Sequence, residues 1–133
     1  MKRRILLYTE GRGRKVAAGD KASTIRPRAG CKAGDTLEHR EWAGLPYRSK
    51  QRKLCTSVCS RVRTVRITPV GVSIEGEQLG VEPLRILAQR EGFEDVAAML
   101  LWFAKSYKTA DFRGELIEWE AGTLVLGEGA EGS

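Results

Sequence analysis

The chain has 133 residues, close to the most common size of a single globular domain. Hydrophobic residues make up 41% and charged residues 30% of it, which is typical of an ordinary soluble protein. No apolar run approaches the roughly 18 residues that cross a bilayer, and the apolar stretch after the initial MKRR is too short for a signal peptide. We therefore expect a cytoplasmic protein that does not associate with membranes.

The charge is divided unevenly along the chain. Residues 1–74 contain 18 Lys or Arg and 5 Asp or Glu, whereas residues 75–133 contain 5 and 12. Between residues 42 and 74 there are seven basic residues and no acidic one. A one-sided field of this kind attracts a polyanion or a phosphorylated ligand. The alternative is a solvated surface whose charges only keep the protein soluble.

In chain order, the first half of the sequence predicts short strands separated by Gly- and Pro-containing turns. A helical turn over residues 15–18 is expected to end at Gly19, and residues 43–53 form a basic loop. Pro27 stops the second strand, because proline cannot donate to a ladder. The predicted strands are ILLY (5–8), ASTIR (22–26), TLEHREW (36–42), the long alternating LCTSVCSRVRTVRIT (54–68) and VGVSIEG (70–76).

The second half predicts two helices and a closing strand. The first helix begins near Glu82–Pro83 and ends at Gly92, and the second begins near Glu94–Asp95. The second helix buries apolar residues at helical spacing and ends among Lys105 and Lys108. FRGELIEW follows as a strand. The sequence thus predicts an α+β protein, a small β-barrel of about five or six strands with two or three flanking helices.

Three cysteines raise the question of a metal site. An odd number of cysteines without a dense framework fits a reducing compartment. Cys55 and Cys59, with Cys31 and His39 upstream, invite a zinc interpretation. On a strand, however, two residues four apart lie about 13 Å from each other, too far to bind one ion. We expect small buried cysteines and no metal or other cofactor.

The stretch GDKASTIRP (19–27) concentrates reactive side chains. Alternation on a strand places Thr24 and Arg26 on one face and Ser23 and Ile25 on the other, with Ile25 in the core. Lys21 can reach Thr24 only if the chain bends at Gly19–Asp20. Thr24 is then a candidate nucleophile with Lys21 as its base. The alternative is a hydroxyl at a strand edge beside a solvated lysine.

Glu91 is the second candidate position. At the end of a helix the macrodipole disfavours a negative charge by some tenths of a kcal/mol, although exposed helix ends tolerate it. A carboxylate aimed at a basic pocket would instead be compensated by Lys21 or Arg26. It could then accept a proton or orient a water molecule.

The motif GDKASTIRP resembles the G-x-K-x-x-T-I-R signature of the ASCH family, small β-barrels related to the PUA domains that bind RNA. KAGDTLEHREW resembles the family's GD turn and the strand after it. LAQREGFEDVAAMLLWFAKSY is similar to its A-x-x-E-G-F segment and second helix, and FRGELIEW to its closing strand. The basic RSKQRKLCTSVCSRV resembles a variant of phage and bacterial members. The resemblance covers residues 5–120 in order, so we expect one domain over 1–120 and a flexible Gly/Glu-rich tail over 121–133, frayed past about Leu126.

The resemblance implies a pocket rather than one activity. Similar members include a 4-acetylcytidine amidohydrolase that uses the lysine and threonine of the motif and a glutamate on the following helix. On this chain these are Lys21, Thr24 and Glu91, with Arg26 as a ligand-binding residue. The 43–53 loop is longer and more basic than in the compact hydrolases, which favours a larger nucleic-acid ligand.

Three functions follow as hypotheses: hydrolysis of an amide on a modified nucleoside, RNA binding without chemistry, and metal-independent RNA cleavage in the same pocket. The expected partner is RNA or a nucleoside or nucleotide, and the expected state is a monomer or weak dimer. Trp42 and Tyr47 are available to stack on bases. The remaining candidate ligand-binding residues are Ser23, Arg48, Lys50, Arg52 and Lys53.

Overall fold

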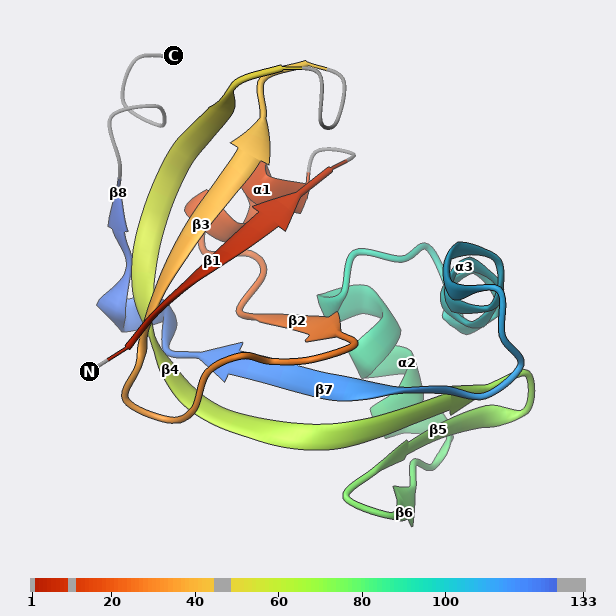
Figure 1. Cartoon of the computed structure of the whole chain (residues 1–133). Helices are drawn as coiled ribbons and strands as arrows, with labels where there is room; N and C mark the ends of the chain where they lie inside the picture. The colour runs from red at the N-terminus through yellow and green to blue at the C-terminus, as the bar shows by residue number, and fades with distance from the viewer. Residues whose placement is uncertain (1, 10–11, 45–48, 127–133) are drawn as a thin grey trace. The chain divides into compact units, whose positions relative to one another are not determined.

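The computed structural model describes residues 2–9, 12–44 and 49–126 (Figure 1). The chain divides into two compact units, which are described separately below. The first comprises residues 1–22, 30–61 and 118–133, and the second comprises residues 23–29 and 62–117. Two strands, β4 (Gln51–Thr68) and β7 (Phe112–Trp119), contribute residues to both units.

The first unit is built on a parallel pair of strands. β1 (Arg3–Tyr8) runs parallel to β3 (Thr36–Trp42), and β3 pairs antiparallel with the first part of β4. The last two elements of the described chain are a short 3₁₀ turn at Ala121–Thr123 and β8 (Val125–Leu126), which pairs with β4.

The helix α1 (Arg12–Ala17) contacts β1 and β3 of the same unit. Its Val16 is fully buried, and Gly13 lies so close to Leu54 that a Cβ would be 2.5 Å from the leucine Cδ1. Gly19 ends the turn after α1 with a φ of +83°, the left-handed conformation that glycine adopts without strain. The chain therefore turns at Gly19, a change of direction that the glycine permits.

The second unit packs two helices against a small sheet. It contains β2 (Ser23–Arg26), β5 (Gly71–Ile74), β6 (Glu77–Gln78), residues 62–68 of β4 and most of β7. Positive φ values at Glu75 and Gly76 allow the two-residue turn between β5 and β6. The helices are α2 (Val81–Arg90) and α3 (Val96–Tyr107).

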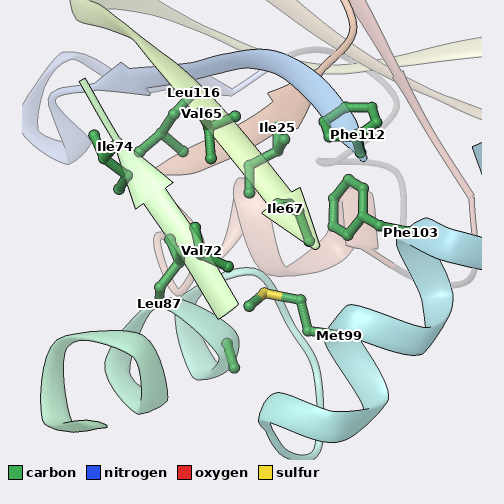
Figure 2. Close-up of a cluster of buried hydrophobic side chains, with 11 residues drawn as sticks. Ile25, Val65, Ile67, Val72, Ile74, Leu87, Met99, Phe103, Phe112 and Leu116 are labelled. Atoms are coloured by element: carbon green, nitrogen blue, oxygen red, sulfur yellow. The ribbon is translucent and has the colours of Figure 1, made fainter. Parts of the chain in front are cut away.

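The core of the second unit lies between these helices and the sheet (Figure 2). Alternation along β4 sends Val65 and Ile67 into it, while Thr64 and Arg66 lie on the other face. Ile25 of β2 is also in this core, as the sequence predicted. The other members are Val72, Ile74, Leu87, Ala88, Met99, Phe103, Phe112 and Leu116.

The α+β class is confirmed, the sheet is mixed, and several details are corrected. The described residues contain eight strands, more than the five or six predicted. The additional strands are β6 and β8, which have only two residues each and are too short to show an alternating pattern in the sequence. The predicted loop 43–53 is too long, since β4 already begins at Gln51, opposite Trp42. Among the described strands the pairings do not close a ring, so the barrel stays a prediction.

The predicted domain boundaries also remain predictions. Of the predicted tail, residues 121–126 carry the 3₁₀ turn and β8, whereas residues 127–133 lie outside the described residues. No helix in the described part of the chain is long and apolar enough to span a membrane.

Candidate functional site

The strand β2, which belongs to the second unit, carries two buried hydroxyl side chains. Ser23 and Thr24 are 7% and 5% exposed, and Arg26 ends the strand half-buried. β2 pairs with β7, where the absence of a side chain at Gly114 allows a close approach. A Cβ on Gly114 would lie only 2.5 Å from the carbonyl oxygen of Arg26. The position of β2 therefore depends on this glycine.

Glu91 is brought to the same strand by the end of α2. The amide of Gly92 donates to the carbonyl of Gln89, and that of Phe93 donates to Ala88, which is the Schellman arrangement of a helix end. Glu91 is thereby fixed as the C-cap of α2 and is 4% exposed. The Ser23 hydroxyl donates a hydrogen bond to its Oε2. This donor offsets part of the unfavourable placement of a carboxylate at a helix C-terminus.

Thr24 has a different partner. Arg26 Nε donates to Thr24 Oγ1 at 3.2 Å. Alternation along β2 places these two side chains on the face opposite to Ser23. The structure thus pairs Ser23 with Glu91 and Thr24 with Arg26, and sequence reasoning found the four residues without finding these two pairs.

Lys21 is 2% exposed and belongs to the first unit. Its backbone amide donates to the carbonyl of Lys15 at 3.1 Å, in the turn that follows α1. A lysine is almost never buried to this extent without a partner for its ammonium group. Its predicted place in one pocket with Thr24 and Glu91 stays a prediction.

Comparison with protein-family models, with curated proteins and with solved structures found no match.

Tyr107 is an aromatic residue near this site that sequence reasoning missed. Burial raises the pKa of its phenol, and the charge of Arg26 partly opposes that rise. Its ring contacts those of Trp102, Phe103 and Phe112. Tyr107, at the end of α3, therefore joins the aromatic cluster of the second unit, and the charge of Arg26 acts on its phenol.

The basic residues of β3 and β4 are tied to carboxylates of the first unit. Arg52 forms an ion pair with Glu41, and Lys53 Nζ lies 3.8 Å from Glu38. Trp42 is half-buried at the end of β3, and Lys50 is exposed, with its carbonyl accepting from Ala43. The candidate ligand-binding residues Tyr47 and Arg48 lie outside the described residues.

Glu38 is the centre of a charge cluster that the sequence did not reveal. It is 2% exposed and is contacted by three cations, Arg3, Arg40 and Lys53. Desolvation raises its pKa, but the hydrogen bond from Arg40 and the charges of all three cations outweigh it, so the pKa lies below its usual value. Three cations on one carboxylate leave a local excess of two positive charges.

The cysteines are buried as predicted, except that Cys31 is only half-buried. Desolvation raises the pKa of Cys55 to about 11 and that of Cys59 to about 12, so both thiols are protonated at neutral pH and poorly nucleophilic. Within the described residues no group of three His, Cys, Asp or Glu is arranged to hold a metal ion.

His39 lies in a buried polar network of the first unit. The Tyr8 hydroxyl is 2.9 Å from its Nδ1 and the Ser57 hydroxyl is 2.8 Å from its Nε2. The Trp119 ring packs on it at a centroid distance of 4.5 Å. Both ring nitrogens are satisfied, so the only histidine of the chain has a structural explanation.

Proposed function

We propose that this protein binds RNA, or a nucleoside or nucleotide, and hydrolyses an amide on a modified nucleoside such as 4-acetylcytidine. The proposal includes the ASCH relationship, a PUA-like barrel, a cytoplasmic location and a monomer or weak dimer. It rests on the G-x-K-x-x-T-I-R resemblance of residues 19–26 and on the side chains of β2.

The observation that carries the proposal is the contact between Arg26 and Thr24. The Arg26 guanidinium donates an N–H to the buried Thr24 oxygen at 3.2 Å, which favours negative charge on that oxygen. The same guanidinium can stabilise the negative charge that develops on the oxygen of an attacked carbonyl group. A plain strand edge does not need an arginine in this position. Glu91, held by Ser23, adds a fixed carboxylate in the same unit.

In the proposed reaction Thr24 Oγ1 attacks the acetyl carbon, and the neutral amine of Lys21 takes the hydroxyl proton. Arg26 stabilises the oxyanion. The C–N bond then breaks, and the proton on Lys21 passes to the departing exocyclic amine, which leaves as cytidine. Water, oriented by Glu91, hydrolyses the acetyl ester on Thr24 to acetate and restores the hydroxyl.

The test is turnover of 4-acetylcytidine by the wild type and by Lys21→Ala, Thr24→Ala and Glu91→Ala. Loss of a base or nucleophile is expected to lower kcat by about 10²–10⁴-fold, because the attacking oxygen is then absent or remains protonated. Glu91→Gln keeps a hydrogen-bond acceptor for Ser23 and separates lost chemistry from lost packing.

Thr68→Ala is the matched control for Thr24→Ala. Thr68 is also a strand threonine of the second unit, at the end of β4, and its hydroxyl accepts from the Val70 amide. It should leave kcat unchanged. Full turnover by Thr24→Ala would rule out the nucleophile, and a wild type without turnover would rule out this chemistry.

A second candidate, RNA binding without chemistry, is favoured by the excess positive charge around Glu38. Arg3, Arg40 and Lys53 keep side-chain exposures of 57%, 32% and 45% while Glu38 is buried. Phosphates can therefore approach the cations without competing directly with the carboxylate. Cleavage of the bound RNA, rather than binding alone, would point to the ribonuclease alternative.

For this candidate we expect the affinity for single-stranded RNA to fall steeply with salt, because each neutralised phosphate releases counterions. Lys53→Gln should reduce the slope of log K against log salt by about 0.7, the value for one contact to a single strand. Lys105→Gln, an exposed lysine of α3, is the control and should leave the slope unchanged. A flat salt dependence in the wild type would exclude binding of this type.

A further inference from the structure

The second unit contains a groove that the residues of β2 and Glu91 do not use. Its volume is about 490 Å³, within the roughly 300–1,000 Å³ of small-molecule sites. It lies on the face of β4 and β5 opposite to the core shown in Figure 2, because Thr64, Arg66 and Ser73 alternate with core residues. The lining residues are Pro27, Thr64, Val65, Arg66, Ser73, Gly76, Arg113 and Gly114.

Two arginines in this groove share a single carboxylate. Arg66 Nε is 2.7 Å from Asp111 Oδ1, and its Nη2 is 3.2 Å from Oδ2. Arg113 Nη2 and Nε lie 3.1 and 3.3 Å from the same Oδ2. One carboxylate for two guanidinium groups leaves one net positive charge at this point of the groove.

The arginines also keep hydrogen-bonding capacity. A guanidinium has five N–H donors, and in each arginine the contacts with Asp111 engage Nε and Nη2. Arg66 and Arg113 are 54% and 72% exposed, so an incoming anion can reach Nη1 of both. Asp111 holds the two forks in place, which lowers the entropy lost when a ligand binds.

The remaining lining suits a flat ring rather than a bare anion. Two glycines, Gly76 and Gly114, and the ring of Pro27 present no charge and no long side chain. Guanidinium planes stack on nucleobases, and a Cβ at Gly76 would meet nothing within 4 Å, which leaves room for a planar group there. The hydroxyls of Thr64 and Ser73, which donate to Glu75 and Gln78, keep lone pairs for N–H or O–H groups of a base or ribose.

We propose that this groove binds one nucleotide unit of single-stranded RNA, with its phosphate on Arg66 and Arg113 and its base over Gly76 and the Pro27 ring. The choice of ligand rests on the proposed RNA binding, but the groove needs neither Lys21, Thr24 nor Glu91. It is a second site, because none of the residues assigned to the proposed chemistry lines the groove.

The test is titration of the full chain with a pentauridylate. Binding is measured by calorimetry and by changes in backbone amide chemical shifts in two-dimensional NMR. Saturable shifts are expected at Ser73, Gly76 and Gly114. The double variant Arg66→Gln/Arg113→Gln should raise Kd about 10–50-fold and reduce the salt slope by about 0.7, the value for one phosphate contact to a single strand. Arg85→Gln is the control, because Arg85 is 51% exposed and paired with Glu82 on α2.

Each outcome decides the proposal. The proposal that the groove binds RNA would be overturned if the wild type does not bind the pentauridylate. It would also be overturned if Arg66→Gln/Arg113→Gln binds with the same affinity as Arg85→Gln. Equal affinity for pentaglutamate, or for inorganic phosphate alone, would overturn the nucleotide assignment. If the groove binds RNA but the protein does not turn over 4-acetylcytidine, the groove proposal is supported and the proposed chemistry fails. If the protein turns over 4-acetylcytidine but the double variant binds RNA as the wild type does, the chemistry is supported and the groove proposal fails.

Discussion

The free energy of unfolding of an Arg40→Met variant is expected to be about 3 kcal/mol lower than that of the wild type. Glu38 is 2% exposed, and Arg40 binds its Oε2 through both Nε and Nη2. Removing this guanidinium leaves a buried carboxylate with only two cations, which are more exposed. The loss is at the low end of the range of about 3–5 kcal/mol for a broken buried pair, because Arg3 and Lys53 remain. Urea denaturation at pH 7 measures it.

The pH dependence identifies Glu38 as the cause. Its pKa is lower in the folded chain than its ordinary value of 4.5, so it stabilises the fold above that value and stops doing so as pH falls through the folded pKa. The difference between wild type and Arg40→Met should therefore be full above about pH 5.5 and shrink towards zero in acid, where Glu38 is protonated in both proteins.

Two further variants complete the test. In Glu38→Gln/Arg40→Met the buried charge is gone, so this double variant should be more stable than Arg40→Met alone. Arg85→Met removes an arginine from an exposed ion pair with Glu82 and should cost less than about 1 kcal/mol. A pH-independent loss in Arg40→Met, or a double variant less stable than the single one, would mean that lost packing explains the effect.

Local patterns predicted most of the second unit. The second helix was expected from Glu94–Asp95, and α3 begins at Val96 because Asp95 caps it by accepting from the Ala98 amide at 2.7 Å. FRGELIEW matches β7 residue for residue. The first helix ends where Gly92, with a φ of +88°, allows the left-handed turn. Caps, glycines and alternation are local signals, so one sequence is enough to read them.

Pairing between distant segments was not predictable in the same way. β1 pairs parallel with β3, and β8 pairs with Cys55 and Thr56 of β4. Two-residue strands such as β6 and β8 carry no periodicity of their own. They exist because a neighbouring strand offers unpaired backbone groups, and the sequence does not show which neighbour that is.

The candidate site shows the same limit. Alternation along ASTIR placed Ile25 in the core, but it could not show that Ser23 would donate to Glu91, 68 residues later. The partners of Glu38 come from three separate strands, which makes the cluster invisible to any local pattern. Residue chemistry selected the candidates, whereas tertiary packing decides which of them meet.

Gly114→Ala is expected to cost about 3 kcal/mol of unfolding free energy, the upper end of the usual effect of overpacking. The new methyl group would lie 2.5 Å from the Arg26 carbonyl oxygen and 2.7 Å from the Phe112 ring. Neither is a flexible side-chain end, because one is backbone and the other is a buried core ring. β2 must therefore move away from β7, and Thr24 and Arg26 move with it.

Gly80→Ala is the matched control for this effect. Gly80 has an ordinary φ of −71°, and a Cβ there would meet only the Pro83 Cδ, at 3.9 Å. Gly80 is the N-cap of α2, and its replacement by alanine should lower the free energy of unfolding by less than about 1 kcal/mol and leave ligand binding unchanged. Because β2 carries the proposed nucleophile, Gly114→Ala should lower both stability and turnover, although Gly114 takes no part in the chemistry. Equal stability of the two variants would show that β2 does not depend on this close approach.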